Sequence, residues 1–157
     1  MKPKVYLETS IISYMAARIS RDLVVAGHQQ ITAEWWHDSR NHFDVYTSEL
    51  VIRESGAGDP EAAEKRLKLL ENMPTLTIDD EVMALAIALL DTKAVPPQAV
   101  EDAYHIALAT VHGMDYLLTW NCKHIANAAM WYQIGKICRS HGYEPPIIST
   151  PEQLAEK

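Results

Sequence analysis

The stretch KVYLETSII, residues 4–12, decides the fold, because in it an apolar strand leads directly into a helix. Glu8 interrupts the apolar run and is followed by Thr9 and Ser10. A carboxylate that is buried in an apolar strand without a partner costs on the order of several kcal/mol. Glu8 therefore lies either at the exposed end of the strand or at a site that requires a carboxylate.

Strands and helices alternate along the rest of the chain. Runs of β-formers predict four further strands, over residues 43–48, 75–78, 115–119 and 145–150. Helical patterns predict segments at 10–17, 23–41, 49–55, 60–72, 79–90 and 97–113, one helix or two within 122–142, and a last turn over 151–157. Helical crossovers between strands imply a mainly parallel sheet. We therefore predict an α/β fold, a three-layer α/β/α sandwich with about five strands.

The composition limits the class of protein. The chain has 157 residues, 48% of them hydrophobic, which predicts one soluble domain over residues 1–157. The longest apolar run, at 82–90, is too short to span a bilayer, and no small-residue cleavage site follows Lys2 and Lys4, so neither a membrane span nor a signal peptide is expected. Two cysteines without CxxC spacing indicate free thiols in a reducing cytoplasm. The net charge of −7 argues against a protein that coats nucleic acid.

Four polar residues that are far apart in sequence are predicted to meet at one edge of the sheet. Glu8 ends the first strand, and residues 119–121 end the fourth. Glu54 lies on the helix that leaves the second strand from this same carboxyl edge. Asp102 lies early in the helix that returns to the start of the fourth strand, so it also begins near this edge. We expect Glu8, Glu54, Asp102 and Asn121 to share one cleft.

Three carboxylates in one cleft predict a cation. Their mutual repulsion raises their pKa values unless a positive charge neutralises them. Oxygen ligands favour Mg²⁺ or Mn²⁺ over zinc, and such an ion activates water and stabilises charge on a phosphoryl group. Glu8 is thus expected to hold metal.

Four segments carry a resemblance to a known family: VYLETSIISY, SELVIRE, EDAYHIALA and LLTWNCKHIAN, which start at residues 5, 48, 101 and 117. Over essentially the whole chain, the sequence resembles the PIN-domain family, which includes the VapC-type toxins. Two positions depart from the family pattern. Glu8 stands where the family usually has Asp, and Asn121 replaces the usual fourth acid.

The resemblance implies a metal-dependent endoribonuclease that hydrolyses RNA phosphodiesters with metal-activated water. It assigns Glu8, Glu54 and Asp102 to the metal, and Asn121 to the orientation of water or a carboxylate. Thr9 and Thr119 would support the site through their hydroxyl groups. Substrate contacts are expected at Ser10 and Lys123. It further implies an antitoxin partner, a homodimer and a role as the toxin of a toxin–antitoxin pair.

Two alternatives remain open from the residues. A catalytically weak PIN-like module that binds RNA or protein is motivated by Asn121 and the acidic charge balance. A phosphatase of the haloacid-dehalogenase kind also places an acid at the end of its first strand. That chemistry needs an Asp nucleophile with a second Asp two residues later, a pattern that Glu8 and Ser10 fit poorly. His105, on the helix of Asp102, is expected to pack beside the site or to face solvent.

Overall fold

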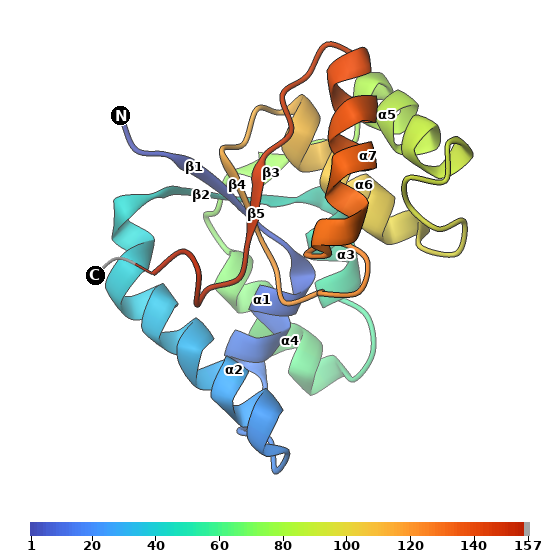
Figure 1. The fold of residues 1–157 in the computed structure, drawn as a ribbon. Coiled ribbons are helices and arrows are strands. Elements are labelled where there is room, and N and C mark those ends of the chain that lie inside the picture. The colour runs from blue at the N-terminus through green and yellow to red at the C-terminus, as the bar shows by residue number, and fades with distance from the viewer. Residues whose placement is uncertain (156–157) are drawn as a thin grey trace.

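A five-stranded parallel sheet runs through the computed structural model, which describes residues 1–155 (Figure 1). The strand order is β3-β2-β1-β4-β5, and each paired strand is parallel to its neighbour. The strands are β1 Lys4–Leu7, β2 Asp44–Ser48, β3 Thr75–Leu76, β4 Tyr116–Leu118 and β5 Ile147–Ser149. The central position of β1 explains its apolar sequence, since Val5, Tyr6 and Leu7 are fully buried.

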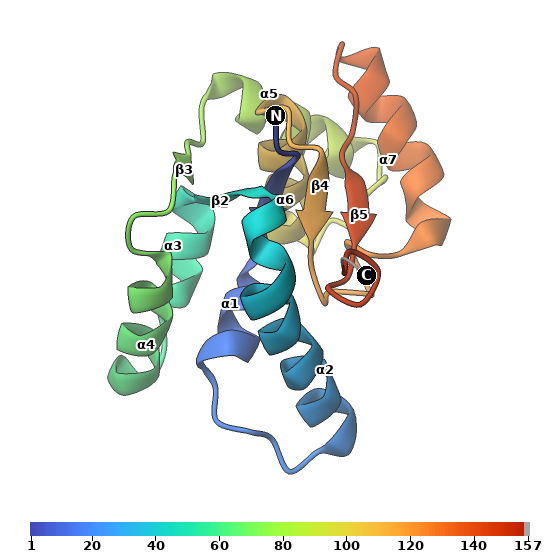
Figure 2. The ribbon, with the colours of Figure 1, turned by 90° about the vertical axis from the view of Figure 1, so that its left-hand side faces the viewer.

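The helices form two groups, one on each face of the sheet. They are α1 Thr9–Ala16, α2 Leu23–Glu34, α3 Glu49–Ser55, α4 Pro60–Leu70, α5 Asp80–Asp91, α6 Val100–Val111 and α7 Ala128–Ser140. Helix α1 contacts α2, α3 and α4, whereas α5 contacts α6 and α7. The two groups meet where α3 contacts α6, and Figures 1 and 2 show α5, α6 and α7 above α1, α2 and α4. The predicted three-layer α/β/α architecture is confirmed.

Local signals in the sequence set most helix starts. The side chain of Asp22 accepts hydrogen bonds from the first turn of α2, and Ser48 accepts one from the Val51 N–H. Asp59 caps α4, with Pro60 at its first position. Such caps satisfy N–H groups that have no partner inside the helix.

Several predicted boundaries are wrong. Helix α6 begins at Val100 rather than at Pro97, because residues 96–99 form a turn in which the Ala99 N–H donates to the Pro96 carbonyl at 2.9 Å. Helix α7 begins only at Ala128, since the side chain of Asn127 caps its first turn and leaves 122–127 as a loop.

The helix predicted over 23–41 changes its geometry after Glu34, into a π-helical turn at Trp35–Ser39 and a 3-10 turn at Arg40–His42. β3 is shorter than expected. The last turn covers 151–154, and residues 156–157 of the segment predicted there lie outside the described residues. Within residues 1–155, no helix is both long enough and apolar enough to cross a membrane.

Candidate functional site

Glu8 lies where β1 ends and α1 begins. The register pairs Leu7 with Leu118, and the Glu8 N–H donates to the Leu118 carbonyl, so residues 8 and 119 leave the sheet side by side. Only 6% of Glu8 is exposed. Its Oε1 accepts hydrogen bonds from the hydroxyl groups of Ser10 and, at 2.6 Å, Thr119. These donors offset part of the cost of burying the carboxylate.

Glu54, near the end of α3, is held by two donors from other elements. Its Oε1 lies 2.6 Å from Oγ1 of Thr9 and 2.7 Å from Nε2 of His105. Burial alone would raise the pKa of this carboxyl group. The hydrogen bonds from His105 and Thr9, with the positive charge of Arg53, outweigh burial, so the pKa of Glu54 lies below its ordinary value. The structure therefore favours an ionised Glu54.

A buried chain of hydrogen bonds continues from Glu54 into the core. An ionised carboxylate has no proton to donate, so Nε2 of His105 is the donor in this contact. The other ring nitrogen, Nδ1, lies 2.6 Å from the Tyr6 hydroxyl, which in turn lies 2.9 Å from Oγ of Ser48. Burial raises the pKa of Tyr6 well above its ordinary value, so the phenol keeps its proton. Because Ser48 also caps α3, the chain ties Glu54 to the start of its own helix.

Asp102 is held differently, by one side chain. The Nδ2 group of Asn121 donates to Oδ1 of Asp102 at 3.0 Å, while Oδ1 of Asn121 accepts from the His124 N–H at 3.1 Å. Burial and the negative charges of Glu8 and Glu54 raise the pKa of Asp102, although His105 and His124 act in the opposite direction. Asn121 is thus the only side chain among the described residues that donates a hydrogen bond to Asp102.

The three carboxylates share a second property. In each, the hydrogen bonds of the described residues use one oxygen only: Oε1 of Glu8, Oε1 of Glu54 and Oδ1 of Asp102. The other oxygen of each has no protein donor within residues 1–155. No Lys or Arg side chain of that range forms an ion pair with any of them. The site therefore concentrates negative charge and leaves oxygen atoms open.

The carboxylate oxygens of the site are chemically suited to bind a hard divalent cation. Their present arrangement is less suited to it. Carboxylate oxygens are the ligands that Mg²⁺ and Mn²⁺ prefer. Among the described residues, however, no group of three or more His, Cys, Asp and Glu side chains is arranged to hold a metal ion. The carboxylates interact through their charges without converging on one point. Binding of one ion by all three carboxylates would require at least one of them to move.

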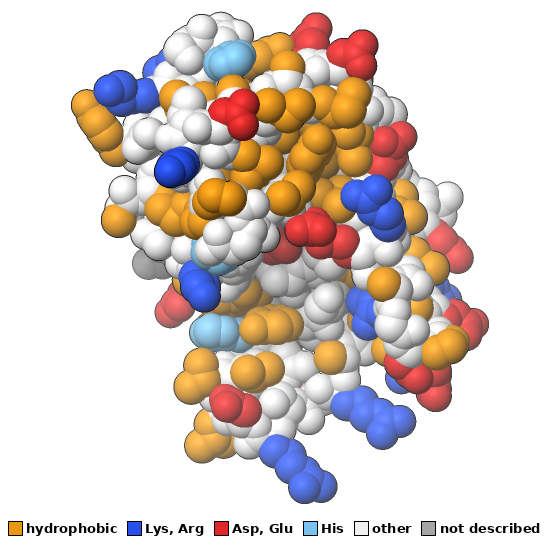
Figure 3. Space-filling model, turned by 90° about the vertical axis from the view of Figure 1, so that its right-hand side faces the viewer, with side chains coloured by type: hydrophobic (Ala, Val, Ile, Leu, Met, Phe, Trp, Pro, Cys, Tyr) orange, Lys and Arg blue, Asp and Glu red, His pale blue; other side chains and the backbone are white. Residues whose placement is uncertain are grey.

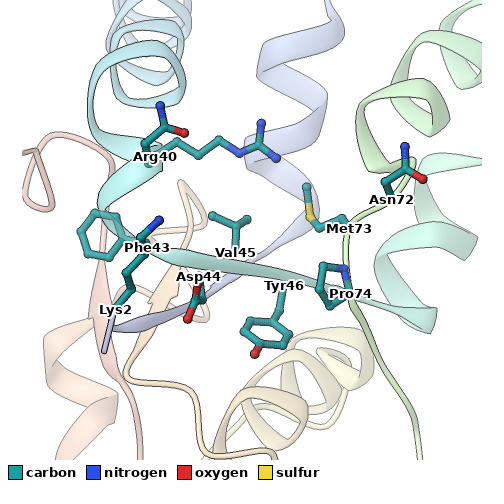
Figure 4. Close-up of a pocket in the computed structure, with 10 residues that line it drawn as sticks. Lys2, Arg40, Phe43, Asp44, Val45, Tyr46, Asn72, Met73 and Pro74 are labelled. Atoms are coloured by element: carbon teal, nitrogen blue, oxygen red, sulfur yellow. The ribbon is translucent and has the colours of Figure 1, made fainter.

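Figure 3 shows one face of the molecule with a hollow across its middle, where acidic side chains lie along the upper edge and histidines lie at the left. A separate cavity of about 430 Å³ lies at the opposite, amino edge of the sheet, between Lys2, Asp44 and Pro74 (Figure 4). None of the residues predicted to be catalytic lines that cavity.

The remaining residues predicted for the site differ in their environments. Thr9 and Thr119 donate to Glu54 and Glu8, which is the supporting contact expected of them. Ser10 donates to Glu8 and accepts from the Trp120 N–H, so its hydroxyl is engaged on both sides. Lys123 is exposed in the loop after β4, and no described side-chain contact joins it to the carboxylates. Substrate contacts by Ser10 and Lys123 stay predictions.

Two residues of the site were not among those predicted for it, although their separation in sequence from the predicted acids indicates that they lie near them. Tyr6 precedes Glu8 by two positions on a strand, a separation that places both side chains on one face. His105 follows Asp102 by three positions on α6, which places both on one side of that helix. His105 is 1% exposed, so it packs beside the site and does not face solvent.

Comparisons with known proteins support the fold alone. No family model matches the sequence, and no curated protein matches it. The structure is similar to a chain in the crystal structure of VapBC2 from Rickettsia felis bound to a DNA fragment from their promoter. The two share 14% sequence identity at a TM-score of 0.60, over 94% of this chain and 98% of that one. The architecture is therefore that of a PIN-like α/β domain.

Proposed function

We propose that this protein is a divalent-metal-dependent ribonuclease of the PIN type, which hydrolyses RNA phosphodiesters with Mg²⁺ or Mn²⁺. One observation carries the proposal. Three carboxylates from separate parts of the chain lie within electrostatic reach of one another, and each has one oxygen that accepts no hydrogen bond from residues 1–155. Proteins rarely gather acids in this way without a cation to neutralise them.

The residues of the site would divide the work. Glu8, Glu54 and Asp102 would hold the ion through their open oxygens. A divalent ion held there supplies Lewis acidity and lowers the pKa of water. Thr9, His105 and Thr119 keep Glu8 and Glu54 in place while the phosphodiester binds. Asn121 sets the position of Asp102 by donating to it.

Cleavage of a labelled single-stranded RNA tests the proposal. Wild-type protein should cut in Mn²⁺ or Mg²⁺ and stop when EDTA is added. Glu54→Gln keeps the shape of the side chain and removes its charge, so cleavage should fall by more than about 100-fold, the upper end of what loss of an outer ligand partner costs. Glu64→Gln, an exposed acid on α4, is the matched control and should cut as the wild type does. Cleavage that persists in EDTA, or in Glu54→Gln, would contradict the proposal.

A non-catalytic binding module is the second candidate function. The neutral Asn121 favours it, because the carboxylate usual at that position is absent and the amide is already engaged on both sides. Such a module would bind RNA equally well with and without a divalent ion. Absence of cleavage by the folded wild type in both Mg²⁺ and Mn²⁺ would favour this candidate.

The similarity to VapBC2 extends the proposal to partners. In that crystal structure, VapBC2 is bound to a DNA fragment from their promoter. By analogy, we propose that this chain is a toxin that binds an antitoxin. We further propose that it acts in the cytoplasm and forms a homodimer. Co-expression with the product of a neighbouring small gene, followed by size-exclusion chromatography, tests the complex. Elution of the chain alone, unaffected by co-expression, would contradict it.

A further inference from the structure

Three aromatic rings from separate elements stack beside the carboxylates. His28 of α2 and Trp120 after β4 lie face to face, with ring centroids 4.0 Å apart and planes inclined by 10°. Tyr14 of α1 lies 6.3 Å from each of them, at angles of 22° and 26°. All three residues stay partly exposed, whereas Trp35, an aromatic residue of the core, is 1% exposed.

Hydrogen bonds fix this stack to the candidate active site. The Trp120 N–H donates to Oγ of Ser10 at 2.9 Å, and the same hydroxyl donates to Glu8. The Trp120 indole Nε1 donates to Oγ1 of Thr32 at 2.7 Å, and Thr32 bonds to the carbonyl of His28. The indole is therefore held in one orientation, and the backbone N–H of the same residue lies two hydrogen bonds away from the Glu8 carboxylate.

The position of Tyr14 follows from helix geometry. Tyr14 lies four residues after Ser10 on α1, so the two side chains lie on the same face of that helix, one turn apart. The aromatic stack therefore lies next to the hydrogen bonds that surround Glu8. An aromatic surface that is held rigidly before binding loses little entropy when a flat ligand covers it.

We propose that Tyr14, His28 and Trp120 form a stacking platform for an unpaired nucleobase of single-stranded RNA, next to the phosphodiester at the carboxylates. The inference rests on the proposed function and adds a substrate contact to it. Nucleobases stack on aromatic side chains without regard to sequence, and each base contributes enough to change affinity by roughly 5- to 150-fold. Because the platform binds RNA before and during reaction, it should act on KM more than on kcat.

Two measurements on the full-length protein test the platform. Fluorescence anisotropy of a labelled single-stranded RNA in EDTA gives the affinity, and cleavage kinetics in Mn²⁺ give kcat and KM. Trp120→Leu and Tyr14→Leu should each weaken binding and raise KM by roughly 5- to 150-fold, with kcat within about 2-fold of wild type. Trp120→Phe keeps an aromatic face and should restore most of the affinity.

Controls separate the platform from the fold and from the catalytic proposal. Tyr132→Leu removes an aromatic ring of α7 that is 78% exposed, and it should bind RNA as the wild type does. Circular dichroism and thermal unfolding identify folded variants, and Tyr14→Leu provides the test if Trp120→Leu does not fold. An oligonucleotide series with one abasic position each should show one position, next to the cut, at which Trp120→Leu causes no further loss.

The outcomes distinguish the two proposals. Loss of RNA binding in folded Tyr14 and Trp120 variants, in a protein that cuts no RNA, would support the platform and overturn the nuclease. Unchanged affinity and KM in those variants, or a wild type that does not bind single-stranded RNA, would overturn the platform. Retained RNA affinity with loss of a protein partner would also overturn it.

Discussion

Glu54 and Asp102 lie within electrostatic reach of each other but are held in opposite ways. Glu54 accepts two hydrogen bonds, and one of its donors, His105, continues through Tyr6 to Ser48 inside the core. From the residues that the structure describes, Asp102 accepts one hydrogen bond, donated by Asn121 in the loop after β4. The pKa of Glu54 is lowered, whereas burial and neighbouring acids raise the pKa of Asp102.

The difference indicates which half of the site moves. A carboxylate with two donors, one of them buried, is costly to displace, whereas a carboxylate with one donor from a loop can rotate. Among the described residues, no three His, Cys, Asp or Glu side chains are arranged around a point at which they could hold a metal ion. We therefore expect Glu54 to stay and Asp102 to turn toward it when an ion binds.

The largest expected effect on stability comes from breaking the chain of hydrogen bonds that links Glu54 through His105 and Tyr6 to the core. Tyr6→Phe removes the hydroxyl between His105 and Ser48 and leaves Nδ1 of a buried histidine without its partner. An unsatisfied buried polar group costs about 1–3 kcal/mol, which urea unfolding should register as a lower free energy of unfolding. Tyr104→Phe is the control, since no described hydrogen bond involves that hydroxyl, and it should change stability by less than about 0.5 kcal/mol. Equal stability of the two variants would mean that this chain of hydrogen bonds does not anchor Glu54.

Neutralising each carboxylate in turn should give opposite results in the absence of metal. Glu54→Gln weakens charge-assisted hydrogen bonds from Thr9 and His105, so the free energy of unfolding should fall by about 1–2 kcal/mol. Asp102→Asn removes a charge that faces Glu8 and Glu54, so stability should rise or stay the same. Thermal unfolding with and without Mn²⁺ checks both, and the ion should stabilise Asp102→Asn less than wild type. A large loss of metal-free stability in Asp102→Asn would identify Asp102 as a structural residue instead.

Asn121→Asp tests the contact that holds Asp102. The new carboxylate can still accept from the His124 N–H, but it places a negative charge where Asp102 received a donor. Metal-free stability should fall modestly, by up to about 1 kcal/mol, and Mn²⁺ should bind more tightly because a full charge replaces an amide dipole. Isothermal titration with Mn²⁺ measures the affinity. Weaker Mn²⁺ binding in this variant would show that the amide donor matters more than the added charge.

The smallest effect concerns pH. A lowered pKa means that Glu54 stabilises the fold above its ordinary value of 4.5 and loses this contribution as pH falls through the lowered value. A raised pKa means that Asp102 costs stability at neutral pH and that this cost disappears as pH falls from the raised value toward 3.8. Relative to wild type, Asp102→Asn should thus lose its advantage as pH falls through this range. Parallel pH profiles of wild type and Asp102→Asn would contradict the raised pKa.

The sequence predicted the sheet from short-range patterns. The prediction that four polar residues share one cleft applied one topological rule to that sheet. The strand of Glu8 is apolar, and residues at the carboxyl ends of parallel strands meet. The predicted start of α6 was wrong because Pro97 suits both a first helical turn and the tight turn that residues 96–99 form. The stack of Tyr14, His28 and Trp120 and the contact between Tyr6 and His105 join elements distant in sequence, and no spacing rule relates them.

A crystal structure with Mn²⁺, in which the ion is located by anomalous scattering, tests the central claim most directly. We expect one Mn²⁺ bound to the open oxygens of Glu8 and Glu54, at roughly 2.0–2.3 Å. Asp102 should have rotated to join them, while His105 still donates to Glu54. An ion bound away from these residues, or carboxylates that stay as they are at saturating Mn²⁺, would contradict the account.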